Sequence, residues 1–437
     1  MAEWGWQGPP IFASLPRMPG QLQWGLGDES MSEITTTCCI AGGGPAGMML
    51  GFLLARAGVD VVVLEKHADF LRDFRGDTIH PSTMQLMAEL GLLDEFLKLP
   101  HTKERHVSVR VGQDEIAMAD FSHLKVAAPY IAFMPQWDFL DFLADHGRAL
   151  PRFKLMMQAK ATGVLREGGR VTAVTAETPE GPVTIRATLT VAADGRGSDL
   201  RAAAGFTVTD IGAPMDVLWF RLSQKPGDPA QTLGQIAAGR FFIMLNRGDY
   251  WQCAFVIPKG SLEPLKAAGL DAFREGLVAL APRLADRVGE LASWDDIKLL
   301  SVAVNRLERW WQPGLICIGD AAHAMSPVGG VGVNLAIQDA VATANLLAAP
   351  LREKRLTDAD LAAVQARREW PMKVTQAMQV TIQTRLISSV LGSRGTLATP
   401  WPLKLFKHIP WLRRIPARMI GIGVRPEHIG PELAPRP

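Results

Sequence analysis

Residues 319–334, with the sequence GDAAHAMSPVGGVGVN, combine an acid with a proline and several glycines. The Asp320 carboxylate can accept hydrogen bonds from sugar-like hydroxyl groups. Glycines such as Gly330 allow the backbone to approach a ligand closely. If a helix begins near this point, the N–H groups of Gly332, Val333 and Asn334 offer partial positive charge to an anionic ring edge. This pattern predicts a site for a flat polar ligand, although a glycine-rich loop alone is usually an ordinary turn.

A strand and a helix are expected on the two sides of this segment. The apolar run 315–318 reads as a buried strand, and the apolar stretch that starts at Asn334 reads as a helix. Pro327 and the glycines that follow it therefore form a strand-to-helix loop, in which Pro327 to Gly330 would lie beside the ligand.

A second glycine motif lies near the front of the chain. The β-rich run 35–40 leads into glycines 42, 44 and 47, which fit G-x-G-x-x-G; an apolar helix and a second strand follow, and the strand ends in an acid 23 residues after the first glycine. This arrangement is typical of a dinucleotide site, with the pyrophosphate on the helix N-terminus and the acid on the adenosine ribose. The residues expected to bind it are Gly42, Gly44, Pro45, Ala46, Gly47, Glu65 and Lys66.

A third motif, Asp194-Gly195, follows the apolar run 188–193 and precedes a short helix signal that contains Ser198 and Arg201. Taken alone, Asp-Gly is more often a turn than a site. Its meaning comes from the two other motifs.

In their order and separation, the three motifs resemble those of the single-component flavoprotein monooxygenases of the p-hydroxybenzoate hydroxylase type, over about residues 33–350. The resemblance implies that the first motif holds the ADP half of FAD. It places Asp194 near the pyrophosphate and the nicotinamide route, and Asp320 near the ribityl chain and flavin. Arg75 resembles the family arginine near the FAD phosphates, and Gln136 resembles the glutamine beside the cofactor. A solvated loop charge and a helix cap are the alternatives for these two residues.

The expected fold is α/β, with a Rossmann-like FAD-binding domain of the glutathione-reductase type, an antiparallel β-sheet substrate domain and a C-terminal helical segment. The expected parts are a disordered extension at 1–30; a discontinuous FAD-binding domain at 31–105, 131–212 and 296–350; a substrate domain at 106–130 and 213–295; and a helical region at 351–437.

Three β-rich runs, 217–222, 240–245 and 250–257, predict the antiparallel sheet, with helices near 271–290. In the resembling family this sheet forms the roof over the substrate. Alternation places Trp219 and Arg221 on one face. Trp219, Arg221 and Tyr250 are candidate substrate contacts, although most aromatic residues in such a sheet belong to the core.

The resemblance implies a monooxygenase that uses NAD(P)H and O2 and inserts one oxygen atom, through a flavin C4a-hydroperoxide, into a small aromatic or other apolar substrate. No catalytic residue is certain: His80 and Pro327 are candidates, and His323 is expected to be structural. The alternatives are a flavin-dependent reductase of a prenyl-type lipid, a halogenase and a non-enzymatic protein that holds FAD or a labile metabolite. The halogenase is disfavoured because Trp-x-Trp occurs only at residues 4–6.

Composition limits the partners. A net charge of +2 gives no field for nucleic acid. Four cysteines predict buried thiols in a cytoplasmic protein, and the nine histidines show no metal-ligand spacing. Residues 401–424 contain five Lys and Arg, no acid and many apolar residues. Two interpretations stay open for them, a peripheral membrane contact and a cap on the substrate domain. The oligomeric state is left open.

Overall fold

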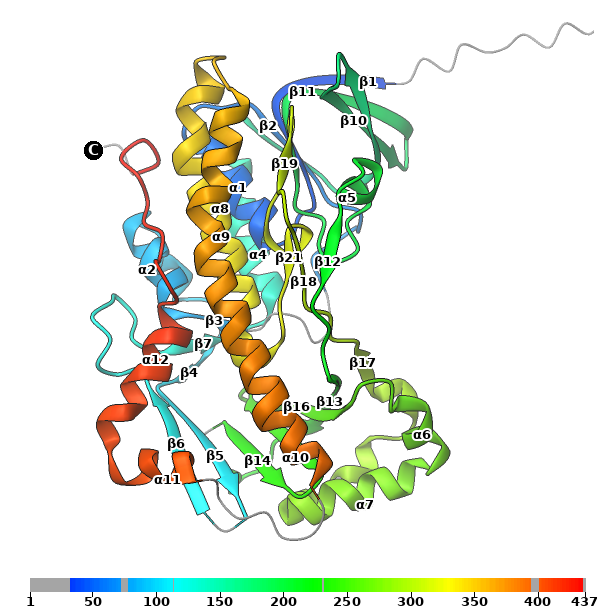
Figure 1. The fold of residues 1–437 in the computed structure, drawn as a ribbon, viewed down its shortest axis with the longest axis vertical. Helices are drawn as coiled ribbons and strands as arrows, with labels where there is room; N and C mark the ends of the chain where they lie inside the picture. The colour runs from blue at the N-terminus through cyan, green and yellow to red at the C-terminus, as the bar shows by residue number, and fades with distance from the viewer. Residues whose placement is uncertain (1–31, 72–77, 113, 230–231, 394–400, 435–437) are drawn as a thin grey trace, which may run out of the picture. The chain divides into compact units, whose positions relative to one another are not determined.

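The largest sheet, called the central sheet below, has eight strands, and its parallel strands carry the three sequence motifs; it lies in the upper half of Figure 1. Its order is β19-β20-β11-β1-β2-β8, and the hairpin strands β9 and β10 extend it beside β11. The strands are β1 Ser32–Ala41, β2 Val61–Leu64, β8 Phe153–Met156, β9 Lys160–Glu167, β10 Arg170–Thr178, β11 Gly181–Ala192, β19 Trp311–Gln312 and β20 Leu315–Cys317. All four residues of β2 are buried, as expected for a parallel strand covered on both faces.

The computed structural model describes residues 32–71, 78–112, 114–229, 232–393 and 401–434, and the chain from Ser32 onward forms one compact unit. The expected extension 1–30 and the candidate Arg75 lie outside the described residues.

Helices α1 (Pro45–Arg56), α4 (Gln136–Arg148) and α8 (Gly332–Arg352) build the largest hydrophobic core with this sheet. Among the described residues, the stretch Val328–Arg352 is long and apolar enough to cross a membrane, but 72% of its apolar window is buried inside the protein. Its side chains, such as Ile337 and Val341, are fully buried in that core. The apolar composition of α8 is therefore explained by its position in the core.

A seven-stranded sheet forms the second layer, in the order β17-β13-β16-β15-β14-β5-β6. The expected antiparallel strands are present as β13, β16 and β15, but β14 pairs with β5 in parallel, so the sheet is mixed. The strands are β5 His106–Val111, β6 Asp114–Asp120, β13 Met215–Ser223, β14 Leu233–Ala237, β15 Arg240–Asn246, β16 Tyr250–Pro258 and β17 Lys298–Leu300.

One face of this sheet packs on helices α6 (Leu262–Ala267) and α7 (Leu270–Leu280), through residues such as Phe220, Trp251 and Phe273. Strand β17 pairs with β13 although it lies beyond the expected limit at residue 295. The division into domains at the expected boundaries stays a prediction.

Two small sheets join the layers: β3 (Thr78–Ile79), β7 (Ile131–Phe133) and β4 (Thr102–Glu104); and β12 (Val208–Asp210), β18 (Asn305–Leu307) and β21 (His323–Ala324). The other described α-helices up to residue 300 are α2 (Pro81–Glu89), α3 (Leu93–Phe96) and α5 (Asp199–Ala203).

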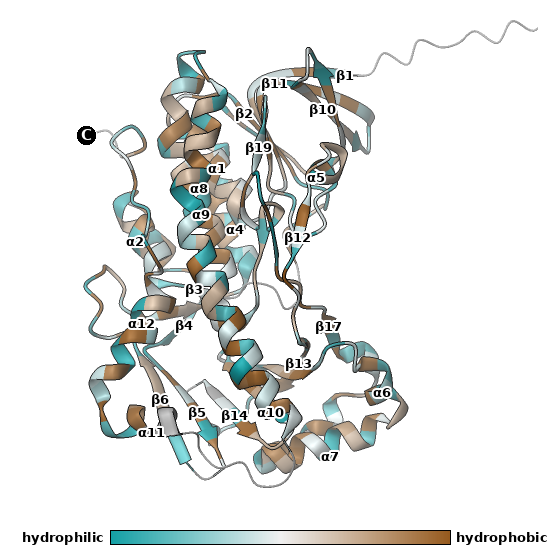
Figure 2. Cartoon of the chain, viewed as in Figure 1, coloured by the Kyte–Doolittle hydropathy of each residue, from teal (hydrophilic) through white to brown (hydrophobic). Residues whose placement is uncertain are grey.

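The C-terminal region is built around α9 (Asp358–Thr381), which runs beside α8 and continues through a π-helical stretch, Ile382–Ile387, into α10 (Ser388–Gly392) (Figure 1). Hydrophobic and hydrophilic residues are mixed along α9 (Figure 2). It spans from strand β19 of the central sheet to α10 at strand β15. Helices α11 (Trp401–His408) and α12 (Arg414–Gly421) follow. This region therefore contacts both large sheets.

Candidate functional site

The three sequence motifs meet at one edge of the central sheet because four parallel strands end there in register. Ala41 of β1 pairs with Leu64 of β2 and with Ala192 of β11, and Ala192 pairs with Cys317 of β20. Each motif begins within two residues of these strand ends. Ligands of open α/β sheets bind outside the carboxyl ends of the strands, so this edge is the candidate cofactor site.

The glycines of the first loop are required for different reasons. A Cβ on Gly42, whose φ is +107°, would lie 2.3 Å from the Ala193 oxygen, and a Cβ on Gly47 would lie 1.9 Å from the Gly42 oxygen. At both positions the backbone of the protein itself leaves no space for a side chain. A Cβ on Gly44 would meet no described atom within 4 Å, and Gly44 is the N-cap of α1 without a side-chain cap. The open space at Gly44 lies where a pyrophosphate would rest on the helix N–H groups.

Glu65 lies directly under this loop. Its Oε2 accepts a hydrogen bond from Gly43 N at 3.0 Å, and its Oε1 accepts one from His67 N at 3.0 Å. The carboxylate is 8% exposed and is thereby fixed beside the glycines. Lys66, the next residue, is exposed.

Gly319 separates the two helices whose N-termini face this edge. It has a φ of +58°, and a Cβ there would lie 3.3 Å from Ala46 of α1 and 3.1 Å from Ala336 of α8. Only glycine allows both helices to approach so closely. Asp320 therefore directly follows the point at which the first turns of α1 and α8 come together, and an anionic ligand would be stabilised near these helix N-termini.

The Asp194 motif is tied to Asp320 through its own loop. Asp194 accepts hydrogen bonds from Ser198 Oγ and, at 3.2 Å, from Leu200 N, so both of its carboxylate oxygens hold the start of α5. Burial raises the pKa of Asp194, and the hydrogen bonds from Ser198 and Leu200 counteract this only in part. Arg196 Nε donates to Asp320 Oδ2 at 3.0 Å. A direct cofactor contact by the Asp194 side chain stays a prediction.

The glycine loop before α8 is held from below by α9. Gln379, which is fully buried, donates from Nε2 to the carbonyl oxygens of Ser326 and Val328, each at 2.8 Å. Pro327 lies between these two anchors and is partly exposed, which suits packing against a ring but offers no proton. Gly330 has a φ of +63°. Sequence reasoning missed Gln379, because nothing local distinguishes a glutamine in a mixed helix.

Asn334 joins α8 to the strand β3 and helix α2. Its Oδ1 accepts hydrogen bonds from His80 N at 2.9 Å and Thr83 Oγ1 at 2.7 Å, and its Nδ2 donates to Thr78 O at 3.1 Å. Thr78 Oγ1 also donates to Gly330 O at 3.2 Å. The Asn334 side chain is thus occupied by the protein, and only its backbone N–H, with those of Gly332 and Val333, stays available for a ligand at the uncapped start of α8.

His80 is buried beside this junction. Its Nδ1 lies 2.8 Å from Ile420 O and donates to it, since a carbonyl oxygen only accepts. Its Nε2 is also buried and has no hydrogen-bond partner among the described residues. Burial lowers the pKa of His80 to about 4, although the bond to Ile420 acts against the shift. The ring is therefore neutral at pH 7, with a free acceptor nitrogen.

His323 belongs to a buried ionic network below the site. Its Nε2 lies 2.6 Å from Asp339 Oδ2, and Arg368 Nε donates to Asp339 Oδ1 at 2.9 Å. Burial raises the pKa of Asp339, but its interactions with His323 and Arg368 outweigh burial and keep that pKa below its usual value. These contacts support the structural role that the sequence predicts for His323.

The face of the seven-stranded sheet that lies opposite α7 turns toward the glycine loop. Trp219, Val217 and Ala254 form one apolar cluster with Val328 of the loop. Arg221 is exposed, and its guanidinium lies 4.8 Å from the centre of the Tyr250 ring. The structure thus brings Trp219 to the loop and places Arg221 and Tyr250 together as a separate pair at the strand ends.

Gln136 is the first residue of α4, after the N-cap Pro135, and is partly exposed. Pro45 occupies the first turn of α1, where its missing N–H costs nothing. Among the described residues, no group of three or more His, Cys, Asp or Glu could hold a metal ion.

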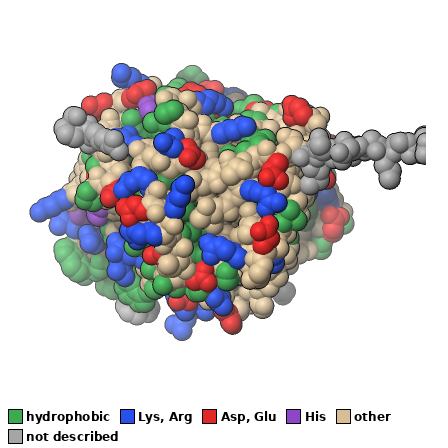
Figure 3. Space-filling model, turned by 90° about the horizontal axis from the view of Figure 1, so that it is seen from above, with side chains coloured by type: hydrophobic (Ala, Val, Ile, Leu, Met, Phe, Trp, Pro, Cys, Tyr) green, Lys and Arg blue, Asp and Glu red, His purple; other side chains and the backbone are tan. Residues whose placement is uncertain are grey.

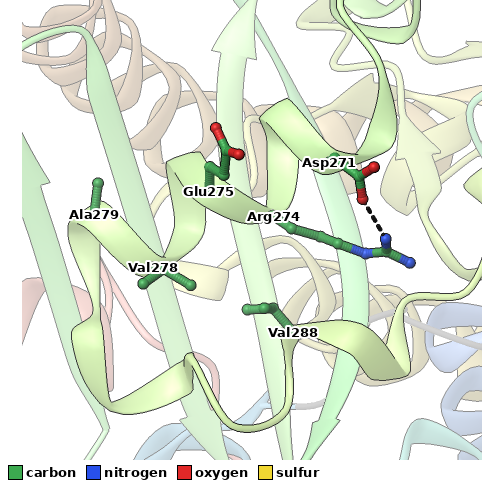
Figure 4. Close-up of a pocket in the computed structure, with 6 residues that line it drawn as sticks. All are labelled: Asp271, Arg274, Glu275, Val278, Ala279 and Val288. Carbon is green, nitrogen blue, oxygen red and sulfur yellow. Dashed lines mark hydrogen bonds and ion pairs between the residues drawn. The ribbon is translucent and has the colours of Figure 1, made fainter.

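Another surface feature lies apart from this site. A shallow depression along α7 is lined by Asp271, Arg274 and Val288, and Asp271 and Arg274 form an ion pair at 2.6 Å (Figure 4). It lies on the helix that covers the opposite sheet face. On the face seen in Figure 3, positive and negative side chains are interspersed, so no single-sign field covers that face.

The residues present fit FAD. The open space at Gly44 and the N-terminus of α1 match a pyrophosphate. The uncapped N-terminus of α8 matches an anionic ring, and the fixed Glu65 carboxylate matches a ribose.

Comparisons with known proteins agree. Residues 35–378 match the family described as FAD binding domain. The chain is 31% identical to 6-methylpretetramide 4-monooxygenase of Streptomyces rimosus over 388 residues, which cover 88% of this chain and 92% of that protein. It spans 64%, 61% and 61% of three longer curated relatives.

Two solved structures share the fold. One is p-nitrophenol 4-monooxygenase of Pseudomonas putida, with a TM-score of 0.72, 19% identity and coverage of 89% of this chain and 97% of that one. The other is anhydrotetracycline hydroxylase of Streptomyces rimosus, with a TM-score of 0.68, 23% identity and coverage of 91% and 78%. These names give no support to the alternative of a prenyl-lipid reductase. The chain belongs to the FAD-binding aromatic monooxygenase family, as an FAD-dependent monooxygenase that uses NAD(P)H and O2.

Proposed function

We propose that this monooxygenase hydroxylates an aromatic polyketide substrate that lies between the glycine loop 327–330 and the sheet face carrying Trp219. The observation that carries this proposal is the apolar cluster that joins Val328 to Trp219 and Val217. An apolar wall directly beside the flavin loop suits a flat, weakly polar ring system. The similarity to 6-methylpretetramide 4-monooxygenase along nearly its whole length supports the same class of substrate.

The roles of the site residues belong to the same proposal. The α1 N-terminus at Gly44 would bind the pyrophosphate, and Glu65 would accept a hydrogen bond from the ribose. When bound and reduced, FAD activates O2 and supplies one oxygen atom to the substrate. The N–H groups of Gly332, Val333 and Asn334 would stabilise negative charge on the flavin ring.

His80 and Pro327 would position rather than react. With its pKa lowered to about 4, His80 is a poor general base at pH 7. Its hydrogen bonds to Asn334 and Ile420 would instead hold the junction beside the glycine loop in place. Pro327 has no group that titrates and would pack beside the flavin ring. Trp219 would offer its flat face to the substrate.

The test is NAD(P)H consumption in air against a panel of tetracyclic aromatic polyketides, simple phenols, quinolones and prenylated quinone precursors, with product masses determined. A gain of one oxygen atom on a polyketide supports the proposal. Oxygen insertion only into simple phenols or quinolones would refute the substrate class, and saturation of a double bond without O2 uptake would refute the reaction.

A matched pair of variants tests the location of the substrate. Trp219→Ala should raise KM about fivefold or more, because a lost aromatic contact costs roughly 1 kcal/mol or more, and should leave FAD content unchanged. Trp370→Ala, an exposed residue of α9 (58% exposed), is the control and should leave KM unchanged. Equal KM values for the two variants would place the substrate elsewhere.

A further inference from the structure

The outer surface of helices α11 and α12 and of the turn between them concentrates exposed apolar side chains. Ten large hydrophobic residues are exposed among the described residues, and four of them lie between 405 and 415. These four are Leu405, Ile409, Trp411 and Ile415, with Trp411 60% exposed. We refer to this surface, together with Arg414 and Arg418, as the α11–α12 face. Such a cluster is a candidate interaction surface.

The opposite side of α12 is fixed to the protein. Ala417 is fully buried in a cluster with Phe121 and Leu124. A Cβ on Gly421 would lie 3.1 Å from both Phe121 and Leu124, so α12 is in close contact with the segment that carries these two residues. The α11–α12 face is therefore held outward on an anchored helix, and its apolar residues are not covered by the described part of the chain.

Positive charge accompanies the apolar residues. Arg414 and Arg418 are exposed, and neither forms an ion pair with a described residue. Some exposed arginines elsewhere are neutralised; Arg152, for example, pairs with Asp60 at 2.7 Å. Lys407 of α11 pairs with Asp114 at 2.9 Å and contributes less.

A cleft of about 600 Å³ beside α12 continues this chemistry. Its walls are mainly apolar, and it is bordered by three cations; the lining includes Leu124, Val126, Trp411, Ile415, Met419, Lys125, Arg414 and Arg418. The acid in the cleft, Glu427, is 2% exposed and bound by Arg367 at 2.9 Å, so its charge is compensated.

We propose that the α11–α12 face docks on an anionic membrane surface. Residues 401–424 contain apolar residues, glycine, proline, five Lys and Arg and one His, but no Ser, Thr, Asn, Gln, Asp or Glu. A protein interface normally has a polar, hydrogen-bonding rim. A bilayer interface instead favours apolar insertion flanked by cations, with Trp at the boundary. The composition therefore favours lipid over an acidic protein partner.

The experiment measures co-sedimentation of the full-length holoenzyme with vesicles. We expect binding to equal mixtures of phosphatidylglycerol and phosphatidylcholine and none to pure phosphatidylcholine. Each Lys or Arg near an anionic surface contributes a factor of about five to binding, so Arg414→Gln with Arg418→Gln should weaken it about 25-fold. Trp411→Ser with Ile415→Ser should also reduce binding.

Matched controls carry the same changes elsewhere. Lys154→Gln with Lys298→Gln removes two exposed charges, and Trp370→Ser removes an exposed tryptophan; both should bind like the wild type. Flavin absorbance of each variant confirms its folding. Absence of wild-type binding to acidic vesicles, equal binding to neutral ones, or unchanged binding of both test variants would overturn the proposal, and the first result would leave an acidic protein as the partner.

Discussion

Gly44 and Gly47 lie three residues apart in the same loop, and the structure predicts opposite consequences for alanine at the two positions. At Gly47 a Cβ would overlap the Gly42 oxygen at 1.9 Å, and backbone must move to relieve it. Such overpacking costs typically 1–3 kcal/mol and occasionally more, while alanine regains about 1 kcal/mol of helix propensity. Because the overlap is with a backbone atom, we take the upper end of the cost, about 3 kcal/mol, and expect Gly47→Ala to lower the free energy of unfolding of the apoprotein by roughly 2 kcal/mol.

At Gly44 a Cβ would meet nothing within 4 Å, and the backbone angles of φ −75° and ψ −176° suit any residue. The apoprotein should lose only the small N-cap preference of glycine over alanine, about 0.5–1 kcal/mol. The Cβ would instead occupy the space that the pyrophosphate needs. A loss of about 1.4–2.8 kcal/mol of binding free energy raises the Kd for FAD by about 10- to 100-fold.

The assay compares urea unfolding of the two apoproteins with FAD titrations followed by fluorescence quenching. Gly44→Ala should be near wild type in unfolding and weak in FAD binding, whereas Gly47→Ala should fail already in unfolding. If Gly44→Ala bound FAD as tightly as the wild type, the pyrophosphate would not rest at the start of α1. If it destabilised the apoprotein as much as Gly47→Ala, the reasoning from open and closed space would be wrong.

Three further predictions concern buried polar groups. Because the pKa of His80 is lowered to about 4, against about 6.5 in the unfolded chain, only the unfolded chain binds this proton between these values; the free energy of unfolding should fall by about 3 kcal/mol as the pH drops from 6.5 to 4. In the His80→Asn variant, the free energy of unfolding should depend less steeply on pH between 6.5 and 4. An unchanged pH dependence would contradict the lowered pKa of His80. Asp339→Asn removes the nearer of two carboxylates that pair with the buried Arg368, the other being Glu427 at 3.4 Å. It should cost about 3 kcal/mol in urea unfolding, whereas Asp60→Asn at an exposed ion pair should cost less than about 1 kcal/mol; equal costs would argue against the buried network. Asn334→Ala removes three hydrogen bonds and should lower the free energy of unfolding by about 3 kcal/mol together with FAD content, and unchanged thermal unfolding would show that the junction does not depend on this side chain.

Local patterns predicted the cofactor edge because its geometry is short-range. A strand, a tight turn and a helix start are encoded within about ten residues, and parallel strands place their ends at one edge. Glycines 42, 44 and 47, Glu65 and Asp320 therefore lie where the sequence expected them, and the fold class was confirmed. Their contacts with FAD stay a prediction, and Arg75 lies outside the described residues.

The sequence could not predict which residues of each motif face open space and which contact only the protein. Gly42 and Gly47 look equivalent to Gly44 in the motif, yet only Gly44 faces open space. Asp194 likewise uses both carboxylate oxygens within its own loop. Such differences depend on which atoms of other strands approach each position.

The amino-acid sequence by itself determined a dinucleotide site and the order of the three motifs along the chain, because these follow from spacings within single strand–turn–helix units. The identity of the cofactor as FAD and the class of reaction came from the resemblance of these motifs to those of a known family. Only the tertiary structure decided which residues support the glycine loop 327–330 and the start of α8. Gln379 reaches Val328 across 51 residues, and His80 reaches Asn334 and Ile420 across 254 and 340 residues. Contacts at such separations arise when helices such as α9 and α12 pack across two sheets. Such contacts form because buried hydrogen-bond donors and acceptors must be paired with whichever groups the packing brings near them. The spacing of residues along the sequence does not show which groups these are.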